Sequence, residues 1–350
     1  MVTIRDVARE AGVSVASASR ALNGHDNVTL ETRTRVQTAA IKLRYVPHSG
    51  ARSLTRRKSD AIGVVLPDLF GEFFSEMIRG IDRVAHAHGL QLLLSNMHGN
   101  PHEESNAVHA MRGRVDGLLV MPPDARRERL FEALSPGLPA VLLNCHVPTP
   151  EIASVGIDNE GAARTMTRHL VTRGYRRIAF VSGPRHNHDS IARQAGFRAA
   201  IAETTGERDP IIIPGDFSEG SGAEAARLLI AGRLEVDAIF CANDMMAIGC
   251  CGVLTEAGIA IGDTVGVAGF DDIPIAHYVA PSLTTMNVRI AELGATAAEK
   301  LIALMSGGDE DIGATILTPQ LVERDSTQRS PVRAPRTDQM IRELQQENPS

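Results

Sequence analysis

After residue 60 the chain alternates short apolar runs with longer amphipathic stretches, and this alternation constrains its fold more than any other feature. The runs predicted as strands are 61–66, 90–95, 117–121, 140–144, 154–157, 178–182, 238–241, 265–270 and 283–286. Helical periodicity occupies most of the gaps, at 73–88, 159–173, 191–204, 219–231, 245–257 and 290–305. Continuous apolar strands separated by helices are typical of parallel sheets covered on both faces. These strands divide most naturally into two sheets, so we expect an α/β core with two lobes.

The first 58 residues differ in charge from the rest of the chain. They hold eleven Lys and Arg against four Asp and Glu, whereas the whole 350-residue chain has a formal net charge of -6. A basic segment attached to an acidic body suggests that the segment contacts a polyanion and the body does not. Nucleic acid is favoured over a membrane, because a membrane-surface helix would place a wide apolar face opposite its positive charges.

Several classes of protein are disfavoured by missing motifs. No apolar run reaches the length of a membrane span, and the start of the chain lacks the layout of a signal peptide, so we expect a cytoplasmic protein. The chain has no GxxxxGK, GxGxxG, GxSxG or HExxH motif, so no cofactor, metal centre or catalytic site is predicted. The cysteines lack metal-ligand spacing and are predicted to be buried, reduced thiols; they are Cys145, Cys241, Cys250 and Cys251.

The first 46 residues read as three short helices. Thr3 can cap the first helix, and Gly12 ends it. Ser14 can cap a second helix that runs to about Asn23, and a third begins near Thr29. The first two helices therefore supply the bracing helix, the tight turn and the outward-facing second helix of a helix-turn-helix.

Two further segments lie outside the predicted core. Residues 47–59 form a basic connector with weak helical potential, and a plain flexible linker is one interpretation of it. Residues 326–350 are polar and contain three prolines, so this tail is predicted to be disordered.

Short motifs recur in a fixed order along the chain. In the basic segment they are Thr3-Ile4-Arg5-Asp6-Val7-Ala8, Ser17-Ala18-Ser19-Arg20-Ala21-Leu22-Asn23-Gly24, Thr32-Arg33, Tyr45-Val46-Pro47 and Ala51-Arg52-Ser53-Leu54. In the core they are Ile62-Gly63-Val64, Asp116-Gly117-Leu118, Cys241-Ala242-Asn243-Asp244, Gly269-Phe270-Asp271-Asp272 and Pro281-Ser282-Leu283-Thr284-Thr285. Through these motifs the chain resembles the lactose repressor (LacI/GalR) family of transcriptional regulators over about residues 2–325.

The resemblance implies an all-α helix-turn-helix headpiece and a hinge helix, joined to a two-lobed α/β core like that of periplasmic binding proteins. The implied segments are the DNA-binding headpiece 1–46, the hinge 47–59, the ligand-binding core 60–325 and the tail 326–350. Within the core, the N-lobe takes about 60–157 and 287–316, and the C-lobe takes about 158–286 and 317–325.

The resemblance also implies which residues contact DNA. Val15, Ala16 and Arg20 match positions that read base edges, with Arg20 the expected guanine contact and simple packing the alternative for Val15. Leu54 from each of two subunits would wedge into a minor-groove step and kink it. The other implied DNA-contacting or anchoring residues are Thr3, Ser17, Ser19, Asn23 and Thr32 in the headpiece, and Ala51 and Arg52 in the hinge.

Ligand-binding residues are expected in a cleft, because ligands of parallel-sheet lobes bind at the carboxyl ends of strands. Phe73 and Phe74 match positions where the family stacks a ligand ring, and core packing is the alternative for either. Arg193 offers a planar fork of donors and Asp271 accepts from vicinal hydroxyls, which suits a polyol. The other candidates across the cleft are Asn187, Asp189, Phe217 and Asn243.

The residues at two of these positions favour a sugar over a nucleobase. Purine-responsive relatives carry an arginine where Asn187 stands and a threonine where Asp189 stands, and the amide and carboxylate found here suit hydroxyls better. After the fourth strand, Cys145 and His146 stand where many relatives have an acidic residue, so no ligand contact is expected from that loop. A purine-responsive or nucleoside-responsive regulator remains the alternative.

The sequence therefore predicts a homodimeric repressor that binds operator DNA and is switched allosterically by a small molecule, for which a sugar is the best match. Inducer and corepressor responses both remain open, because both use the same cleft. A sugar-binding or transport protein would leave the basic first 58 residues unexplained and would need an export signal. A sugar-modifying enzyme would need an acid or metal partner that the sequence does not mark.

Overall fold

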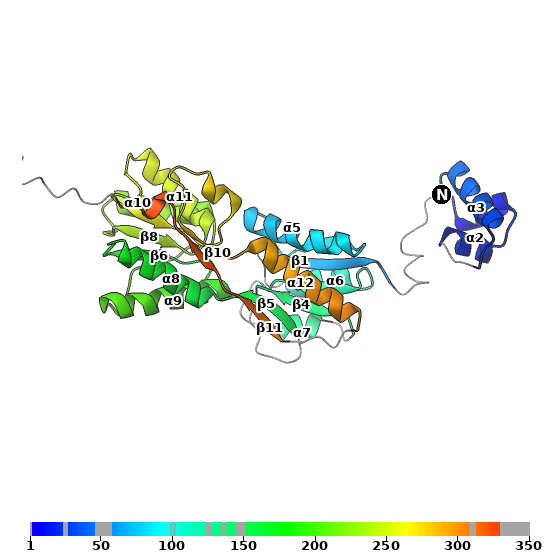
Figure 1. Cartoon of the computed structure of the whole chain (residues 1–350), viewed down its shortest axis with the longest axis horizontal. Helices are drawn as coiled ribbons and strands as arrows, with labels where there is room; N and C mark the ends of the chain where they lie inside the picture. Colours follow the sequence, from blue (N-terminus) through cyan, green and yellow to red (C-terminus); the bar gives the residue numbers. More distant parts are fainter. Residues whose placement is uncertain are drawn as a thin grey trace, which may run out of the picture. The chain divides into compact units, whose positions relative to one another are not determined.

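The computed structural model describes residues 2–23, 27–45, 58–98, 100, 103–122, 128–134, 137–144, 152–307 and 313–329. These residues form two compact units, the first comprising 1–61 with 113–116 and the second comprising the remainder. The first unit is helical and the second is an α/β structure (Figure 1). Most of the predicted hinge, from residue 47 to 57, and the predicted tail from residue 330 onward lie outside the described residues. The first residues of the predicted disordered tail are ordered instead, because Ser326 and Thr327 belong to a short 3₁₀ helix and are buried.

Three helices build the headpiece in the first unit, as the sequence predicts. They are α1 (Ile4–Ala11), α2 (Val15–Leu22) and α3 (Leu30–Lys42). Ser14 and Thr29 cap α2 and α3, because each side-chain oxygen accepts a hydrogen bond from the backbone N–H three residues on. Gly12 ends α1 with a left-handed backbone (φ 63°), which glycine adopts without strain.

A small apolar core holds the three helices of the headpiece together. Val7, Ala18 and Val36 are fully buried and come from α1, α2 and α3 in turn. Arg35 on α3 donates to the Ala11 carbonyl oxygen at 2.5 Å, so the end of α1 is also fixed by a hydrogen bond. The exposed side of α2 is therefore held on a rigid support.

The N-lobe of the second unit is built on a six-stranded sheet with the order β11-β5-β4-β3-β1-β2. Its strands are β1 (Ala61–Leu66), β2 (Gln91–Asn96), β3 (Gly117–Val120), β4 (Ala140–Leu143), β5 (Ala153–Ile157) and β11 (Ala314–Leu317). The pairs β1–β3, β3–β4, β4–β5 and β5–β11 are parallel. Its helices are α5 (Glu72–Ala87), which packs on α12 (Ile290–Met305), and α6 (Glu104–Met111), which packs on α7 (Glu128–Ala133).

The C-lobe is built on a four-stranded parallel sheet with the order β7-β6-β8-β9. The strands are β6 (Ile178–Val181), β7 (Ile212–Ile213), β8 (Ala238–Cys241) and β9 (Gly266–Ala268). The helices are α8 (Asn159–Thr172), α9 (His188–Thr205), α10 (Glu219–Ile230) and α11 (Asp244–Glu256), with short 3₁₀ helices η2 (Pro274–His277) and η3 (Asp325–Thr327). Helices α8 and α9 cover one face of the sheet, and α10 and α11 cover the other (Figure 1).

Three segments connect the two lobes. Strand β10 (Thr285–Asn287) leads from the C-lobe into α12 of the N-lobe, and β12 (Gln320–Val322) follows β11 on the way back. These two crossing strands pair in antiparallel fashion. The third connection runs from β5 into α8, where the Asp158 amide donates to the Leu317 carbonyl oxygen at 3.0 Å. Any change in the angle between the lobes must therefore act on these three segments.

Paired helices of the C-lobe approach each other closely at glycines. A Cβ atom at Gly222 on α10 would lie 1.8 Å from the Met246 carbonyl oxygen of α11. At Gly196 on α9, a Cβ atom would lie 2.2 Å from the Glu160 carbonyl oxygen of α8. Neither backbone could stay in place beside a larger residue, so both helix pairs depend on glycine at these positions.

Each predicted strand corresponds to a strand of the structure, but β7, β11 and β12 were not predicted. Strand β7 has only two residues, which is too short for a recognisable apolar run. Strand β11 lies at the edge of its sheet and alternates exposed and half-buried residues. Strands that are buried on both faces are recognised by a continuous apolar run, and β7, β11 and β12 do not have that pattern.

Candidate functional site

The side chains predicted to read DNA bases lie on the outward side of α2. Ala16 and Arg20 are exposed, and neither belongs to the core of the headpiece. Val15 is 43% exposed, so packing into that core does not account for it. The arrangement presents one long cation between small side chains, which is suited to insertion into a major groove.

The other predicted DNA-contacting side chains of the headpiece lie around the ends of these helices. Ser17 sits at the start of α2 and Thr32 in the first turn of α3, where their amide groups bond the cap residues. Ser19 and Asn23 are half-buried and hydrogen-bonded to each other at 3.4 Å, and Thr3 is exposed before α1. The predicted hinge residues Ala51, Arg52 and Leu54 lie outside the described residues.

A cavity of about 460 Å³ in the second unit is lined by residues from both lobes. Its lining includes segments that follow β1, β4, β6, β7, β8 and β9, which is the strand-end position expected for a ligand of a parallel sheet. The structure brings all the predicted ligand-binding residues to this one cavity: Phe73, Phe74, Asn187, Asp189, Arg193, Phe217, Asn243 and Asp271.

Aromatic rings form one part of the cavity wall. Phe73 and Phe74 meet edge to face, with ring centroids 5.5 Å apart, and both also pack against the apolar core. Phe217 has a left-handed backbone (φ 71°) and lies against Gly183, where a Cβ atom would be 2.3 Å from its ring. Phe73 and Phe74 thus each line the cavity and also pack against the core, so the two alternatives do not exclude each other.

Arg193 lies at the polar end of the cavity and is 3% exposed. Its Nε donates to Asn159 Oδ1 at 2.8 Å, and its Nη1 donates to the Ala242 carbonyl oxygen at 2.5 Å. The guanidinium carbon lies 3.8 Å from the centroid of the Phe270 ring. A guanidinium has five N–H donors, so some of them remain available to a ligand.

Asp271 faces Arg193 across 3.2 Å, measured from Oδ1 to Nη2, in an ion pair whose geometry is not that of a hydrogen bond. Asp271 Oδ1 is buried and has no hydrogen-bond partner among the described residues. Burial raises the pKa of the Asp271 carboxyl to about 7, an effect that Arg193 opposes and that the nearby charge of Asp189 reinforces. The site therefore contains a buried carboxylate that is held by an ion pair to Arg193 and not by a well-aligned hydrogen bond.

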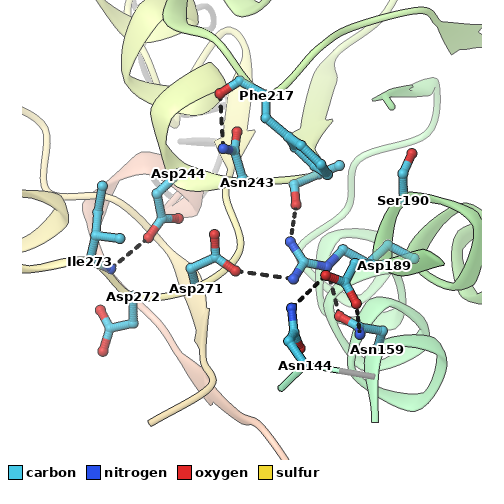
Figure 2. A network of polar contacts seen from close by, with 12 residues as sticks. Asn144, Asn159, Asp189, Ser190, Phe217, Asn243, Asp244, Asp271, Asp272 and Ile273 are labelled. Atoms are coloured by element: carbon cyan, nitrogen blue, oxygen red, sulfur yellow. Dashed lines mark hydrogen bonds and ion pairs between the residues drawn. The ribbon is translucent and has the colours of Figure 1, made fainter. Parts of the chain in front are cut away.

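Asp189 is 6% exposed and is engaged within the protein on both carboxylate oxygens. It accepts from Asn144 Nδ2 at 2.5 Å and from Asn159 Nδ2 at 2.9 Å. Figure 2 shows these three side chains grouped on one side of the network and Asp271 on the other. The sequence analysis expected Asp189 to accept from ligand hydroxyls, whereas in the structure it orients two asparagines.

Two of the predicted ligand residues also cap helices. Asn187 accepts from the Ser190 amide at the start of α9, and Asn243 accepts from the Met246 amide at the start of α11. The Asn243 side-chain amide also donates to the Phe217 carbonyl oxygen at 3.0 Å, which holds the loop that carries this ring (Figure 2). Both asparagines therefore shape the cavity as well as line it.

Asn144 is the residue that the sequence analysis missed. It directly follows β4, lines the cavity and leaves its Oδ1 buried without a hydrogen-bond partner in the described part of the chain. The sequence analysis placed the end of this strand one residue later and considered Cys145 and His146, which lie outside the described residues. Ligands of parallel sheets bind at the carboxyl ends of strands, and Asn144 is the first polar residue after the apolar run of β4. The same reasoning could therefore have selected it.

Three of the four cysteines are described, and Cys241, Cys250 and Cys251 are buried free thiols. Burial raises the pKa of the Cys241 thiol well above its ordinary value. No group of three metal-ligating side chains is found among the residues that the structure describes. No helix in the same residues is long and apolar enough to cross a membrane.

Comparisons with known proteins agree with both units. The model of a family described as bacterial regulatory proteins, lacI family, matches residues 3–48, and that of a periplasmic binding protein-like domain matches residues 167–327. The chain is 37% identical over 332 residues to the HTH-type transcriptional regulator GalS of Salmonella typhimurium, covering 93% of this chain and 96% of that protein.

Solved structures share the fold over most of the chain. One is the lac repressor dimer bound to operator and the anti-inducer ONPF, with a TM-score of 0.81, 29% identity and coverage of 93% of this chain and 99% of that one. Another is a complex of the transcriptional regulator CelR with cellobiose, with a TM-score of 0.69, 30% identity and coverage of 93% and 100%.

Proposed function

This chain belongs to the lacI family of bacterial regulatory proteins, and we propose that it is a homodimeric repressor whose affinity for operator DNA is changed by a sugar. DNA binding is assigned to the headpiece and sugar binding to the cavity of the second unit. Because the target is operator DNA, the proposed site of action is the nucleoid in the cytoplasm.

The single observation that carries the choice of a sugar is a pair of buried acceptors in the cavity that make no well-aligned hydrogen bond. Asn144 Oδ1 has no hydrogen-bond donor among the described residues, and Asp271 Oδ1 forms an ion pair with Arg193 but no aligned hydrogen bond. A buried acceptor without a donor is costly, so a ligand that supplies hydroxyl donors relieves that cost when it binds. Sugars present several hydroxyls in one molecule.

The aromatic wall supports the same ligand class. Phe73 and Phe74 add apolar surface to the lining of the cavity, which is suited to the C–H face of a sugar ring. A lac repressor bound to operator and a CelR–cellobiose complex are among the structures that share the fold. A nucleobase is the second candidate, because its planar ring would also stack on these side chains.

The polar groups discriminate between these two candidates. The ring nitrogens and carbonyl of a purine are mainly acceptors and would need donors from the cavity. The Asn187 side-chain oxygen bonds the Ser190 amide and both Asp189 oxygens accept from asparagines, so the Asn187 side-chain N–H groups and the spare N–H groups of Arg193 stay available as donors. The cavity atoms without an aligned hydrogen bond are the acceptors Asp271 Oδ1 and Asn144 Oδ1, which favours a ligand rich in hydroxyl donors.

The proposed mechanism is a shift in population between two angles of the lobes. A ligand that contacts both lobes stabilises the angle at which its contacts are best made, and this changes the DNA affinity of the dimer. Asn144 from the N-lobe and Asp271 from the C-lobe both line the cavity, so one sugar can contact both lobes.

A thermal-shift screen tests the ligand class. The full chain is heated with D-ribose, D-galactose, cellobiose, adenosine, guanine and hypoxanthine, because only a ligand that binds the native state raises the unfolding temperature. We expect a rise with a sugar and none with the purines, and we expect that rise to disappear in Asp271→Ala. Stabilisation by a purine alone would contradict the proposal.

A second measurement tests the regulator itself. The protein should retard a fragment of the DNA upstream of its own gene, and the sugar found in the thermal screen should change the amount bound. Asp271→Ala should bind this DNA like the wild type but lose the response to the sugar. Failure to retard any such fragment would count against the assignment as a DNA-binding regulator.

A further inference from the structure

Asp271 and Asp272 are consecutive residues that both have left-handed backbones, with φ values of 113° and 57°. A residue with a side chain is rarely stable in this region and stays there only when its surroundings hold it. Figure 2 shows the result, because the Asp271 carboxylate is turned toward the cavity network and the Asp272 carboxylate points away from it. One short loop therefore has one side chain at the cavity and one side chain outside it.

The Asp272 carboxylate joins the two crossing strands. Its Oδ2 accepts from Asn287 Nδ2 at 2.8 Å, and its Oδ1 accepts from Arg324 Nη2 at 2.7 Å. Asn287 is the last residue of β10, and Arg324 lies two residues after the end of β12. The Asp272 and Arg324 side chains are only 12% and 14% exposed, so solvent screens this ion pair weakly.

Hydrogen bonds connect the loop that carries Asp271 and Asp272 to the N-lobe. The Asp271 amide donates to the Met286 carbonyl oxygen of β10 at 3.0 Å. Asn287 Oδ1 in turn accepts from the Arg289 amide at 2.8 Å, and Arg289 directly precedes α12. Hydrogen bonds thus run without a break from the loop at the cavity, through the end of β10, to the first residue before a helix of the N-lobe.

We propose that Asp272 is a positioning residue that couples occupancy of the cavity to the angle between the lobes. The inference rests on the proposed function, since it requires a ligand at Asp271. A ligand hydroxyl that bonds Asp271 Oδ1 biases the position of this loop, and the Asp272 carboxylate passes that bias to both crossing strands. Without this carboxylate the loop can adjust by itself, and the strands then respond little to the ligand.

The test uses Asp272→Asn in the full chain, because this change keeps the size of the side chain and removes its charge. The probe is whichever of D-ribose, D-galactose and cellobiose stabilises the wild type most in the thermal screen. Calorimetry gives the affinity of the free protein for the sugar. Retardation of the upstream DNA fragment, with and without that sugar, gives the factor by which the sugar changes DNA affinity.

We expect Asp272→Asn to keep its sugar affinity and its sugar-free DNA affinity within about threefold of the wild type. The factor by which the sugar changes DNA affinity should fall from roughly tenfold or more to below about twofold. A side chain with only a structural role would lower stability and both affinities together and would leave this factor unchanged. The factor is therefore the decisive readout.

Asp325→Asn is the matched control. Asp325 is adjacent to Arg324, and its carboxylate accepts from Ser282 Oγ at 2.8 Å without contacting β10 in any hydrogen bond of the described chain. The chemical change is the same, so this variant should keep the wild-type factor. Arg324→Ala should also reduce the factor, and the double variant should reduce it no further than Asp272→Asn alone, because Asp272→Asn already removes the ion pair that Arg324→Ala breaks.

Two results would overturn the inference, and they are distinguishable. If Asp272→Asn binds the sugar and keeps the wild-type factor, then Asp272 does not couple the cavity to the lobes, while the proposed function stands. If none of the three sugars stabilises the wild-type protein, the proposed function fails and this inference fails with it.

Discussion

Asn144 Nδ2 donates to Asp189 Oδ2 at 2.5 Å, so the end of β4 in the N-lobe is joined to the first turn of α9 in the C-lobe. The other oxygen of Asp189 accepts from Asn159, and Asn159 accepts from Arg193 Nε. Through Asn159, this buried carboxylate therefore helps to position the guanidinium at the polar end of the cavity. It also forms a direct contact between the two lobes.

Asp189→Ala should destabilise the protein and weaken sugar binding. The substitution leaves the side-chain amides of Asn144 and Asn159 without their acceptor, and a buried donor left unpaired costs about 1–3 kcal/mol. Because Asn159 is then free to turn, Arg193 loses part of its support. Chemical denaturation measures the first effect, and calorimetry with the sugar found in the thermal screen measures the second.

Asp209→Ala is the control for that substitution. Its carboxylate also lies near a guanidinium, at 3.6 Å from Arg198 Nη1, but its side chain is 99% exposed. Exposed pairs of this kind contribute little to stability, so the control should unfold at the same denaturant concentration as the wild type. Equal losses in both variants would contradict the role assigned to Asp189.

Arg20→Ala should lower the affinity for the upstream DNA without changing the stability of the protein. A guanidinium that bonds a guanine contributes about 1–3 kcal/mol, which corresponds to a loss of roughly fivefold to 150-fold. Arg20 is exposed on α2 and lies outside the core of the headpiece, so the thermal unfolding curve should be unchanged. DNA retardation and thermal unfolding of the same preparations supply the two measurements.

Removal of the same charge elsewhere provides the comparison. Arg208 is an exposed cation in the loop after α9, in the second unit. Arg208→Ala should keep its DNA affinity within about twofold, because a charge that is not part of the headpiece is expected to act only through the screened field of the whole protein. If both variants lose affinity equally, net charge explains the effect and Arg20 has no specific contact.

The fold was predictable where a segment is buried on both faces. The runs 61–66 and 178–182 correspond to β1 and β6, which are buried along their whole length. The same rule missed β11, because an edge strand has one side free and does not require an apolar residue at every position. The apolar pattern also did not predict that the crossing strands β10 and β12 pair with each other, since they lie far apart in the sequence.

The predicted ligand-binding residues do line the cavity, but Asn144 and the contacts among the lining residues were not predictable. The strand-end rule and the family resemblance selected Arg193 and Asp271, and both line the cavity. Neither source of information indicated that Asp189 would accept from Asn144, because these residues are 45 positions apart and meet only when the two lobes come together. The role of each lining residue in binding a ligand stays a prediction.

Sugar affinity should rise as the pH increases from about 5 to about 8. Burial raises the pKa of Asp271 to about 7, against the opposing effect of Arg193 and with the support of Asp189. Ligand hydroxyls donate to the ionised carboxylate, so a bound sugar lowers this pKa, and binding is strongest where Asp271 is already ionised. Calorimetry across this range measures the trend, which should disappear in Asp271→Asn.

Asp216→Asn is the control for the pH profile. Asp216 also lines the cavity, but hydrogen bonds from Ser218 hold its pKa below the ordinary value, so it stays ionised over the whole range. This variant should keep the slope of the wild type. A flat wild-type profile would mean that Asp271 does not bond the ligand.

The contribution of Asp271 to the stability of the sugar-free protein should fall as the pH rises. The folded-state pKa of Asp271 is raised above its ordinary value of 3.8, so its contribution is full below about pH 4 and is lost as the pH rises through about 7. Asp271→Asn carries no ionisable group at this position. It should therefore gain stability relative to the wild type as the pH increases, which denaturant unfolding at several pH values would measure.

Gly183→Ala should reshape the cavity while leaving the protein folded. The new Cβ atom would lie 2.3 Å from the ring of Phe217, and this ring is the part that can move. Because the ring lines the cavity, its displacement should lower sugar affinity by roughly tenfold, in line with the loss of one well-made apolar contact. In a Phe217→Leu background the same substitution should change the affinity by less than about twofold, since the effects are coupled through one contact.

Gly252→Ala distinguishes this effect from a general intolerance of added side chains. Gly252 lies within α11, where a Cβ atom would have no neighbour within 4 Å. Alanine is a better helix former than glycine by about 1 kcal/mol, so this control should be at least as stable as the wild type and should bind the sugar equally well. Unchanged sugar affinity in Gly183→Ala would mean that Phe217 does not contact the ligand, because a displaced ring cannot preserve such a contact.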